Sequence, residues 1–349
     1  MQEATTGLES VKEYYGKILQ TSQDLKTSAC CTTDSMPFYL REILKDVHTE
    51  VKDRFYGCGS PIPLSLKGKT VLDIGSGSGR DCFLLSKLVG PNGRVIGIDM
   101  TDEQLDVARR QANYHTEKFG YQQPNVKFIK GYIEDLEGAG IKTESIDLVV
   151  SNCVINLSPS KERVFSEIFR VLKPGGELYF SDVFSSRRIP LDLKQDKVFI
   201  GECLGGSLYT EDFRRLLVQL GCHDYRMTAR STIDLLSEEI KQKAGLIEFY
   251  SMTVRAFKLD LEDRCEDYGQ LATYLGTIPE SPNGFVLDDH HLFEKGKPMP
   301  VCGNTAAMLR DTRYGEHFQI AGNTSTHFGL FDCGPTPTPL AAAEVGACC

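Results

Sequence analysis

The sequence predicts an α/β fold in which helices cover both faces of a mostly parallel sheet, followed by a smaller α+β unit. In the middle of the chain, short apolar runs alternate with helical patterns, as where "TVLDI" at 70–74 precedes "GRDCFLLSKLV" at 79–89. The glycine-rich stretch "GSGSG" joins this first strand to its helix. Strands that alternate with helices predict βαβ crossovers, and such crossovers give parallel pairing.

The remaining elements of the sheet follow in chain order. The expected segments are the strand 94–99, the helix 101–120, the strands 125–131 and 146–152, the helix 161–172 and the strand 176–183. Two further strands, 222–229 and 248–259, are expected to form a terminal pair that closes the sheet. The complete sheet is therefore expected to have about seven strands, most of them parallel.

Four segments are expected along the chain. Residues 1–60 form an N-terminal helical segment that carries Cys30 and Cys58, and residues 61–259 form the cofactor-binding domain. The charged stretch "DLEDRCED" (260–267) begins an α+β domain, 260–330, with two or three strands and a helix from Thr305 to Asp311 capped by Asn304. The Pro/Ala-rich, Cys-containing tail, 331–349, is expected to be disordered.

Composition narrows the class of protein. The formal net charge of -9 argues against a nucleic-acid partner, which requires a basic face. The N-terminal stretch has no apolar core of the signal-peptide type, and no apolar run reaches the length of a membrane span. We therefore expect a cytoplasmic protein with no membrane partner. In a reducing compartment, its 12 cysteines are expected to be buried, catalytic or metal-binding rather than permanently bridged.

The glycine loop, residues 75–79, is the strongest motif. Gly75, Gly77 and Gly79 let the backbone turn sharply and approach a ligand closely. The loop departs from the dinucleotide fingerprint G-x-G-x-x-G because Arg80 occupies the position of the last glycine. A structural glycine turn or an NAD site is the alternative interpretation.

Two acids beside this loop indicate the ligand. Asp73 precedes the first glycine by two residues, where a carboxylate suits an amino-acid ammonium better than a pyrophosphate. Asp99 ends the second strand, where an acid typically binds ribose hydroxyls. An amino acid joined to a nucleoside without phosphate describes S-adenosylmethionine. The residues expected to contact it are Asp73, Gly75, Ser76, Gly77, Gly79, Arg80, Asp99, Met100, Ile133, Glu134 and Asn152.

Within that set, Ile133 and Glu134 follow the third strand at its carboxyl end and are candidates for the adenine pocket. One is apolar, and the other can accept a hydrogen bond from the adenine amino group. The alternative is an ordinary helix N-terminus with acids near its positive end.

Several cysteines stand apart from the expected core. Cys153 lies where the strand 146–152 ends, while Cys58 in "FYGCGSP" and Cys203 in "GECLGG" lie among glycines that indicate close backbone approach. Cys30 lies in a polar segment. Three thiols near a sulfonium methyl suggest a soft acceptor. Zinc is an alternative, but the spacing lacks a C-x-x-C pair. The other alternative, a buried structural thiol, is preferred for Cys82, Cys222, Cys265 and Cys302.

From about residue 14 to 320 the chain resembles the arsenite S-adenosylmethionine methyltransferases of animals and algae. The resemblance is carried by "YYGKIL", "FYGCG", "LDIGSGSGRDC", "VIGIDMT", "FIKGYIE", "VVSNCVINL", "GGELYFSDV" and "GECLGG". It implies a Rossmann-like class I methyltransferase fold, in which Cys153 and Cys203 hold arsenic(III) with Cys58 as the third ligand. It also implies a transient disulfide between Cys30 and Cys58, although Cys31 could replace Cys30 in that pairing.

The expected activity is stepwise methylation of trivalent arsenic, and its expected role is arsenic detoxification. The enzyme is expected to be a monomer that needs no catalytic metal. Thioredoxin or glutathione is the expected reductant. Arsenic bound by thiolates carries a lone pair and no proton, so positioning is expected to supply most of the catalysis without a general base. The alternatives are a C-methyltransferase of the quinone or sterol type, and a non-catalytic thiol protein that binds metalloids.

Three histidines have simpler interpretations. His290 and His291 in "DDHH" are expected on a solvated strand, where adjacent side chains point to opposite faces. His115 is expected on the surface of the helix 101–120.

Overall fold

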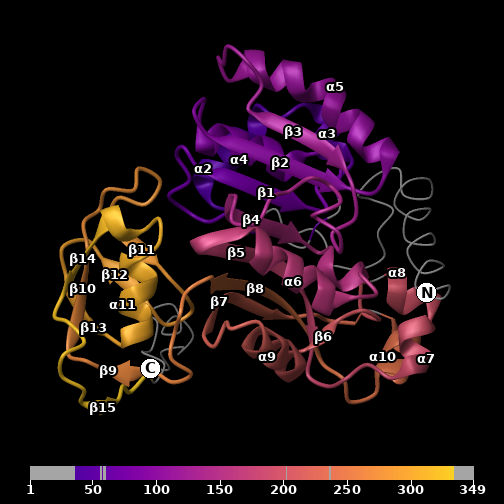
Figure 1. The fold of residues 1–349 in the computed structure, drawn as a ribbon. Coiled ribbons are helices and arrows are strands. Elements are labelled where there is room, and N and C mark those ends of the chain that lie inside the picture. The colour runs from indigo at the N-terminus through magenta and orange to yellow at the C-terminus, as the bar shows by residue number, and fades with distance from the viewer. Residues whose placement is uncertain (1–35, 56, 58–59, 202, 236, 334–349) are drawn as a thin grey trace, which may run out of the picture.

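The computed structural model describes residues 36–333 except 56, 58, 59, 202 and 236 (Figure 1). Its main sheet has the order β3-β2-β1-β4-β5-β8-β7, with the short β6 paired to β5. Strands β1 to β5 pair in parallel, whereas β8 is antiparallel to both β5 and β7. The mostly parallel sheet and its closing antiparallel pair are therefore confirmed.

The strands of this sheet are β1 (Thr70–Ile74), β2 (Arg94–Asp99), β3 (Val126–Lys130), β4 (Ile146–Asn152), β5 (Leu172–Ser185), β6 (Leu208–Tyr209), β7 (Tyr225–Thr232) and β8 (Phe249–Phe257). The helices around it are α2 (Phe38–Lys45), α3 (Thr49–Asp53), α4 (Arg80–Val89), α5 (Asp102–Lys118), α6 (Lys161–Val171), α7 (Leu191–Gln195), α8 (Lys197–Gly201), α9 (Thr210–Gln219) and α10 (Glu238–Ala244). The strands β1 to β5, β7 and β8 and the helices α4, α5 and α6 follow the predicted order, whereas the sequence pattern predicts neither β6 nor α7 to α10.

Helices cover both faces of the sheet, and the side chains of successive strand residues point to opposite faces. Val71 packs with residues of α2, α4 and α5, whereas its neighbour Leu72 packs with residues of α6 and α9. In β4, Leu148 belongs to the same cluster as Val71, and Val149 belongs to the same cluster as Leu72. Strands buried on both faces are typical of parallel sheets, and they explain the continuous apolar runs in the sequence.

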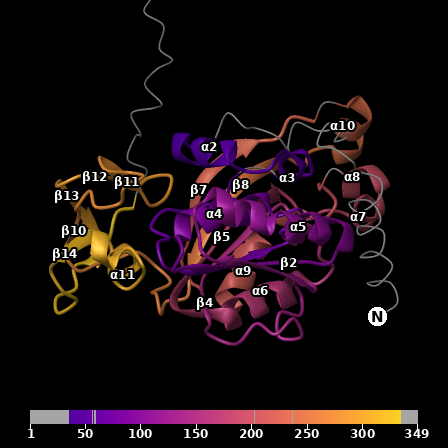
Figure 2. The same ribbon diagram turned by 90° about the horizontal axis from the view of Figure 1, so that it is seen from above.

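The C-terminal unit stands beside the sheet in both views (Figures 1 and 2). Its elements are β9 (Glu266–Asp267), β10 (Gln270–Tyr274), β11 (Gly284–Val286), β12 (Leu292–Glu294), β13 (Pro298–Val301), α11 (Gly303–Arg310), the 3-10 turn η6 (Gly315–His317), β14 (Phe318–Ala321) and β15 (Gly329–Leu330). These strands are more numerous than the two or three expected, because most are too short for an alternating pattern. The helix also starts earlier, and Cys302 rather than Asn304 is its N-cap.

Buried ion pairs connect this unit to the sheet. Arg255 of β8 contacts Glu177 of β5 at 2.8 Å and donates a hydrogen bond to the carbonyl of Leu287 in the C-terminal unit. Arg313 also pairs with Glu177. Removing one partner of a buried pair leaves an uncompensated charge, so these contacts fix the docking of the unit.

The histidine predictions were wrong at two positions. His115 is 1% exposed and stacks on Phe83 with ring centroids 3.6 Å apart, because the end of α5 is covered by the segment at His48. His291 is buried in a turn between β11 and β12, where its Nδ1 lies 2.8 Å from an oxygen of Asp288. Among the described residues, no helix is long and apolar enough to cross a membrane.

Candidate active site

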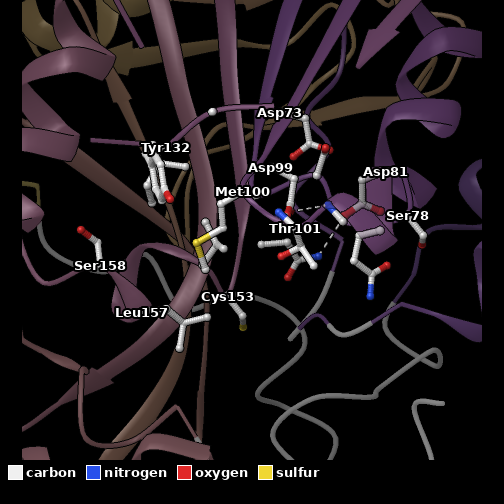
Figure 3. Close-up of a pocket in the computed structure, with 18 of the residues that line it drawn as sticks. Asp73, Ser78, Asp81, Asp99, Met100, Thr101, Tyr132, Cys153, Leu157 and Ser158 are labelled. Atoms are coloured by element: carbon white, nitrogen blue, oxygen red, sulfur yellow. Dashed lines mark hydrogen bonds between the residues drawn. The ribbon is translucent and has the colours of Figure 1, made fainter. Parts of the chain in front are cut away.

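A cleft opens at the carboxyl ends of β1, β2 and β4, where parallel α/β sheets bind ligands (Figure 3). Its empty volume is about 970 Å³, part of which is open to solvent. The side chains and loops that line it are Arg54, Phe55, Asp73, Gly75, Ser76, Gly77, Ser78, Asp81, Asp99, Met100, Thr101, Gln104, Gly131, Tyr132, Ile133, Glu134, Asn152, Cys153, Val154, Leu157 and Ser158. We call this the cofactor cleft.

The glycine loop lines the cleft as predicted from its sequence. Gly75 has a φ of 74°, and a Cβ there would lie 2.3 Å from Val154. Gly77 has a φ of 52°, and a Cβ there would meet no atom within 4 Å. Only glycine adopts such angles without strain, and the space beside Gly77 leaves room for a ligand to approach the backbone.

Three carboxyl groups lie together on one side of the cleft in Figure 3: those of Asp73, Asp81 and Asp99. Burial, reinforced by the nearby Asp81 carboxylate, raises the pKa of Asp73 to about 8. Burial also raises the pKa of Asp99, against hydrogen bonds from backbone amides that lower it. A cluster of desolvated acids favours a cationic ligand, because its positive charge stabilises their ionised forms.

Asp99 also holds the loops of the cleft in place. One carboxylate oxygen accepts a hydrogen bond from the amide of Gly77 at 2.9 Å, and the other accepts one from the amide of Thr101 at 2.8 Å. The glycine loop after β1 and the turn after β2 are thereby fixed to one side chain. Met100, Ile133 and Glu134 line the cleft beyond it, and Glu134 accepts a hydrogen bond from Ser158.

Asn152 ends β4 and lies in the cleft, where its Nδ2 donates to Asp81 at 3.0 Å. The segment before Cys58 packs on it, since a Cβ at Gly57 would lie 2.8 Å from the Asn152 side chain. Two expected cofactor contacts do not line the cleft. Gly79 is the N-cap of α4, and Arg80 is buried against the Phe55 ring and pairs with Asp81 at 2.7 Å.

Cys153 lines the cleft directly after β4, and its amide donates to the Ser181 carbonyl at 2.8 Å. Its φ is 54°, and that of Cys203 is 58°. Non-glycine residues with positive φ are uncommon, and strained backbone of this kind gathers at functional sites. Cys153 is disulfide-bonded in this structure.

Cys203 lines a neighbouring cavity that shares Leu157 and Ser158 with the cofactor cleft. Both cysteines are buried in one apolar cluster, with exposed fractions of 5% for Cys153 and 3% for Cys203. The glycines of "GECLGG" explain this proximity, because a Cβ at Gly206 would lie 2.0 Å from the Asn156 carbonyl oxygen. The close backbone approach predicted there is confirmed. Cys30, Cys31 and Cys58 lie outside the described residues.

Sequence reasoning missed several residues of the cleft, among them Arg54, Phe55, Asp81, Thr101, Gln104 and Tyr132. A signal was available for Asp81, since it lies in the first turn of the helix that follows the glycine loop. Tyr132 precedes two predicted contacts in "GYIED". Arg54 and Phe55 reach the cleft from outside the sheet, and no local pattern predicts that contact.

The cleft fits an amino-acid nucleoside. Ser76 Oγ is buried in its wall and has no hydrogen-bond partner among the described residues, which leaves it available to a ligand. The acids suit cationic groups, and the open space beside Gly77 suits close approach to the backbone. Cys153 stands at the same cleft, so a bound methyl donor and a sulfur-held acceptor can meet there.

Comparisons with known proteins agree with this geometry. The family described as "Methyltransferase domain" matches residues 65–221, and the one described as "Arsenite methyltransferase C-terminal domain" matches residues 268–336. An arsenite methyltransferase of Aquipseudomonas alcaligenes is 53% identical over 98% of this chain and 99% of its own length. That of Homo sapiens is 45% identical over 89% of this chain and 82% of its own.

A solved structure is also similar. The arsenic(III) S-adenosylmethionine methyltransferase from Chlamydomonas reinhardtii superimposes with a TM-score of 0.83 at 49% identity. The match covers 85% of this chain and the whole of that one. Sequence and fold therefore agree over both the sheet domain and the C-terminal unit.

Proposed function

Since the chain belongs to the arsenite methyltransferase family and methylates arsenic(III) with S-adenosylmethionine, we propose that Cys58, Cys153 and Cys203 hold the arsenic for this reaction. The family assignment replaces the quinone-type, sterol-type and non-catalytic alternatives that the sequence left open. The fold is that of a class I methyltransferase with an additional C-terminal unit.

The observation that carries the proposal is the pairing of Cys153 and Cys203 in one buried cluster at the cofactor cleft. The two cysteines lie in separate loops. Each has the left-handed backbone conformation, which an ordinary core cysteine does not require. Thiolates are soft ligands and select soft ions such as trivalent arsenic.

The path of the chain near Cys58 supports its role as the third ligand. Gly57 packs on Asn152, the residue directly before Cys153. Cys58 is the next residue in the chain, so the proposal assigns its thiol to the same end of β4. Arsenite takes three sulfurs, whereas an arsenic that already carries a methyl group takes two, so Cys58 is needed only for the first round.

The chain's own contribution to catalysis is to bind and orient both reactants. S-adenosylmethionine supplies an electrophilic methyl group on a sulfonium. Asp73 binds its ammonium, Asp99 its ribose, and Ile133 and Glu134 its adenine, with Ser76 Oγ as a further polar contact. The remaining expected contacts of the loops are Gly75, Gly77, Met100 and Asn152. The thiolates aim the arsenic lone pair at the methyl, so positioning replaces acid–base catalysis.

The redox part of the cycle involves thiols outside the described residues. We propose a transient disulfide between Cys58 and Cys30 or Cys31, reduced by thioredoxin or glutathione. Cys153 binds arsenic only in its thiol form, so the reductant acts before arsenic binding. We also propose that the enzyme is cytoplasmic and monomeric, that it needs no catalytic metal, and that it has no nucleic-acid or membrane partner. The net charge of -9 is compatible with the absence of a nucleic-acid partner.

Transfer of a labelled methyl group from S-adenosylmethionine to arsenite tests the site. Cys153→Ser and Cys203→Ser should each lose activity while still binding the cofactor, because serine replaces a soft thiolate by a hard hydroxyl. Cys222→Ser is the matched control, since Cys222 is equally buried but lies in the core beneath α9. Equal loss in all three variants, in proportion to their folded fractions, would mean that these cysteines only support the fold.

A further inference from the structure

Three cysteines of the C-terminal part meet in space although they are far apart in sequence. The sulfur atoms of Cys265, Cys302 and Cys333 all lie within 4.8 Å of one another. Cys302 is fully buried, and the other two are half-buried. We call this group the three-thiol cluster. None of its members lines the cofactor cleft.

Regular backbone pairing builds the cluster. Cys265 precedes β9 and Cys333 follows β15, and these two strands pair antiparallel. The amide of Phe331 extends the ladder by donating to the Cys265 carbonyl at 2.8 Å. Cys302 joins them from the end of β13, where it begins α11. The tail expected to be disordered from residue 331 is thus described as far as Cys333, in contact with the unit.

Cys302 lies in a setting that stabilises a thiolate. Its sulfur accepts a hydrogen bond from the amide of Thr305 at 3.4 Å, and the Arg226 guanidinium lies 3.9 Å away. The Thr305 contact is also the N-cap of α11, whereas the Arg226 guanidinium brings a positive charge to the sulfur, which favours a ligand that must lose its proton.

The number of ligands distinguishes between ions. Structural zinc almost always takes four ligands, and the described residues place no fourth Cys, His, Asp or Glu in the cluster. Three thiolates carry three negative charges, which a trivalent ion neutralises. The half-buried Cys265 and Cys333 leave one side open to solvent, where the lone pair of a trivalent metalloid would point.

We propose that Cys265, Cys302 and Cys333 form a second binding site for trivalent arsenic, separate from the site of methylation. Arsenous acid would exchange its three hydroxyls for three thiolates. Three As–O bonds break and three As–S bonds form. The hydroxyls leave as three waters, with one proton from each thiol and one from solvent for each sulfur that is already a thiolate. Arsenic keeps its oxidation state, so no oxidant or reductant is consumed.

Such binding would link β9, α11 and β15 across the C-terminal unit. A ligand that binds only the folded state stabilises it by mass action. The arsenic held there cannot receive a methyl group, because the cluster does not border the cofactor cleft. The site therefore makes the stability of the unit depend on the presence of substrate.

The test uses the full-length protein with Cys58→Ser, Cys153→Ser and Cys203→Ser together, so that the methylation site cannot bind arsenic. After gel filtration with a phosphine reductant, this protein should retain about one arsenic per chain from added arsenite, and the melting temperature should rise. Adding Cys265→Ser or Cys333→Ser should abolish that retained arsenic and the rise in melting temperature. These two variants change half-buried positions, so they keep the test valid even if Cys302→Ser fails to fold. Adding Cys222→Ser instead should change neither.

Two results would overturn the proposal. Arsenic that is retained equally after substitution of the cluster would be bound elsewhere in the chain. Zinc that copurifies in equal amount with the protein, resists arsenite and is lost on Cys302→Ser would identify a structural zinc site instead. Because methylation is already disabled in the background, neither result depends on which cysteines hold the arsenic during catalysis.

Discussion

Asp73 makes the stability of the cofactor-free protein depend on pH near neutrality. The side chain is 3% exposed and accepts a hydrogen bond from the Cys82 thiol at 3.2 Å. Burial and the neighbouring Asp81 raise the pKa of Asp73 from its ordinary 3.8 to about 8. The folded protein therefore keeps a proton that the unfolded chain loses.

The sign and size follow from proton linkage. Between about pH 4 and 8 the folded state holds one more proton at Asp73 than the unfolded state, so raising the pH lowers the free energy of unfolding. The stabilisation is complete below the unfolded pKa and is lost as the pH rises through the folded pKa. One proton corresponds to a slope of about 1.4 kcal/mol per pH unit.

Denaturant unfolding of cofactor-free protein between about pH 5 and 7.5 measures this slope. Asp73→Asn removes the titrating group while it keeps the shape of the side chain, so the slope should become less negative by about 1.4 kcal/mol per pH unit. The comparison with the parent is needed because burial also raises the pKa of Asp182 to about 7, which adds a slope of the same sign. Parallel pH profiles for the two proteins would refute the assignment of a neutral Asp73.

Three further predictions concern the cofactor cleft and its thiols. Asp99→Ala should weaken S-adenosylmethionine binding by about 1.5–3 kcal/mol, or roughly 10- to 150-fold in Kd; unchanged affinity by calorimetry would show that the ribose lies elsewhere. Gly75→Ala should abolish cofactor binding, because the new Cβ would lie 2.3 Å from Val154, whereas Gly68→Ala should preserve it, since Gly68 has a similar φ of 75° but no neighbour within 4 Å. Mass mapping after turnover without reductant should find Cys58 linked to Cys30 or Cys31, and free thiols at all three positions in the stalled enzyme would contradict the proposed cycle.

The parts of the site that sequence reasoning predicted are encoded locally. Gly75, Asp73 and Asp99 belong to a strand–loop–helix–strand pattern, whose residues have the same roles wherever that pattern folds. The alternation of strands and helices likewise depends on neighbours in sequence. Consequently the mostly parallel sheet with its closing pair and about half of the residues that line the cofactor cleft could be predicted without coordinates.

Contacts between distant segments could not be predicted in this way. His115 is buried because a segment near His48 folds over its helix, and nothing within α5 indicates that cover. The three-thiol cluster depends on a pairing of β9 with β15, two strands of two residues each. The N-cap was misassigned for a related reason, since Asn304 donates instead to Asp224 and the Glu262 carbonyl.

Methylation of arsenite and of monomethylarsenite by Cys58→Ser, measured beside Cys153→Ser, tests the proposed arsenic site most directly. Cys58→Ser should lose arsenite as a substrate but still methylate monomethylarsenite, because a methylated arsenic needs only two sulfurs. Cys153→Ser should lose both substrates and keep its affinity for the cofactor. A Cys153→Ser enzyme that stays folded and still methylates arsenite would contradict the account.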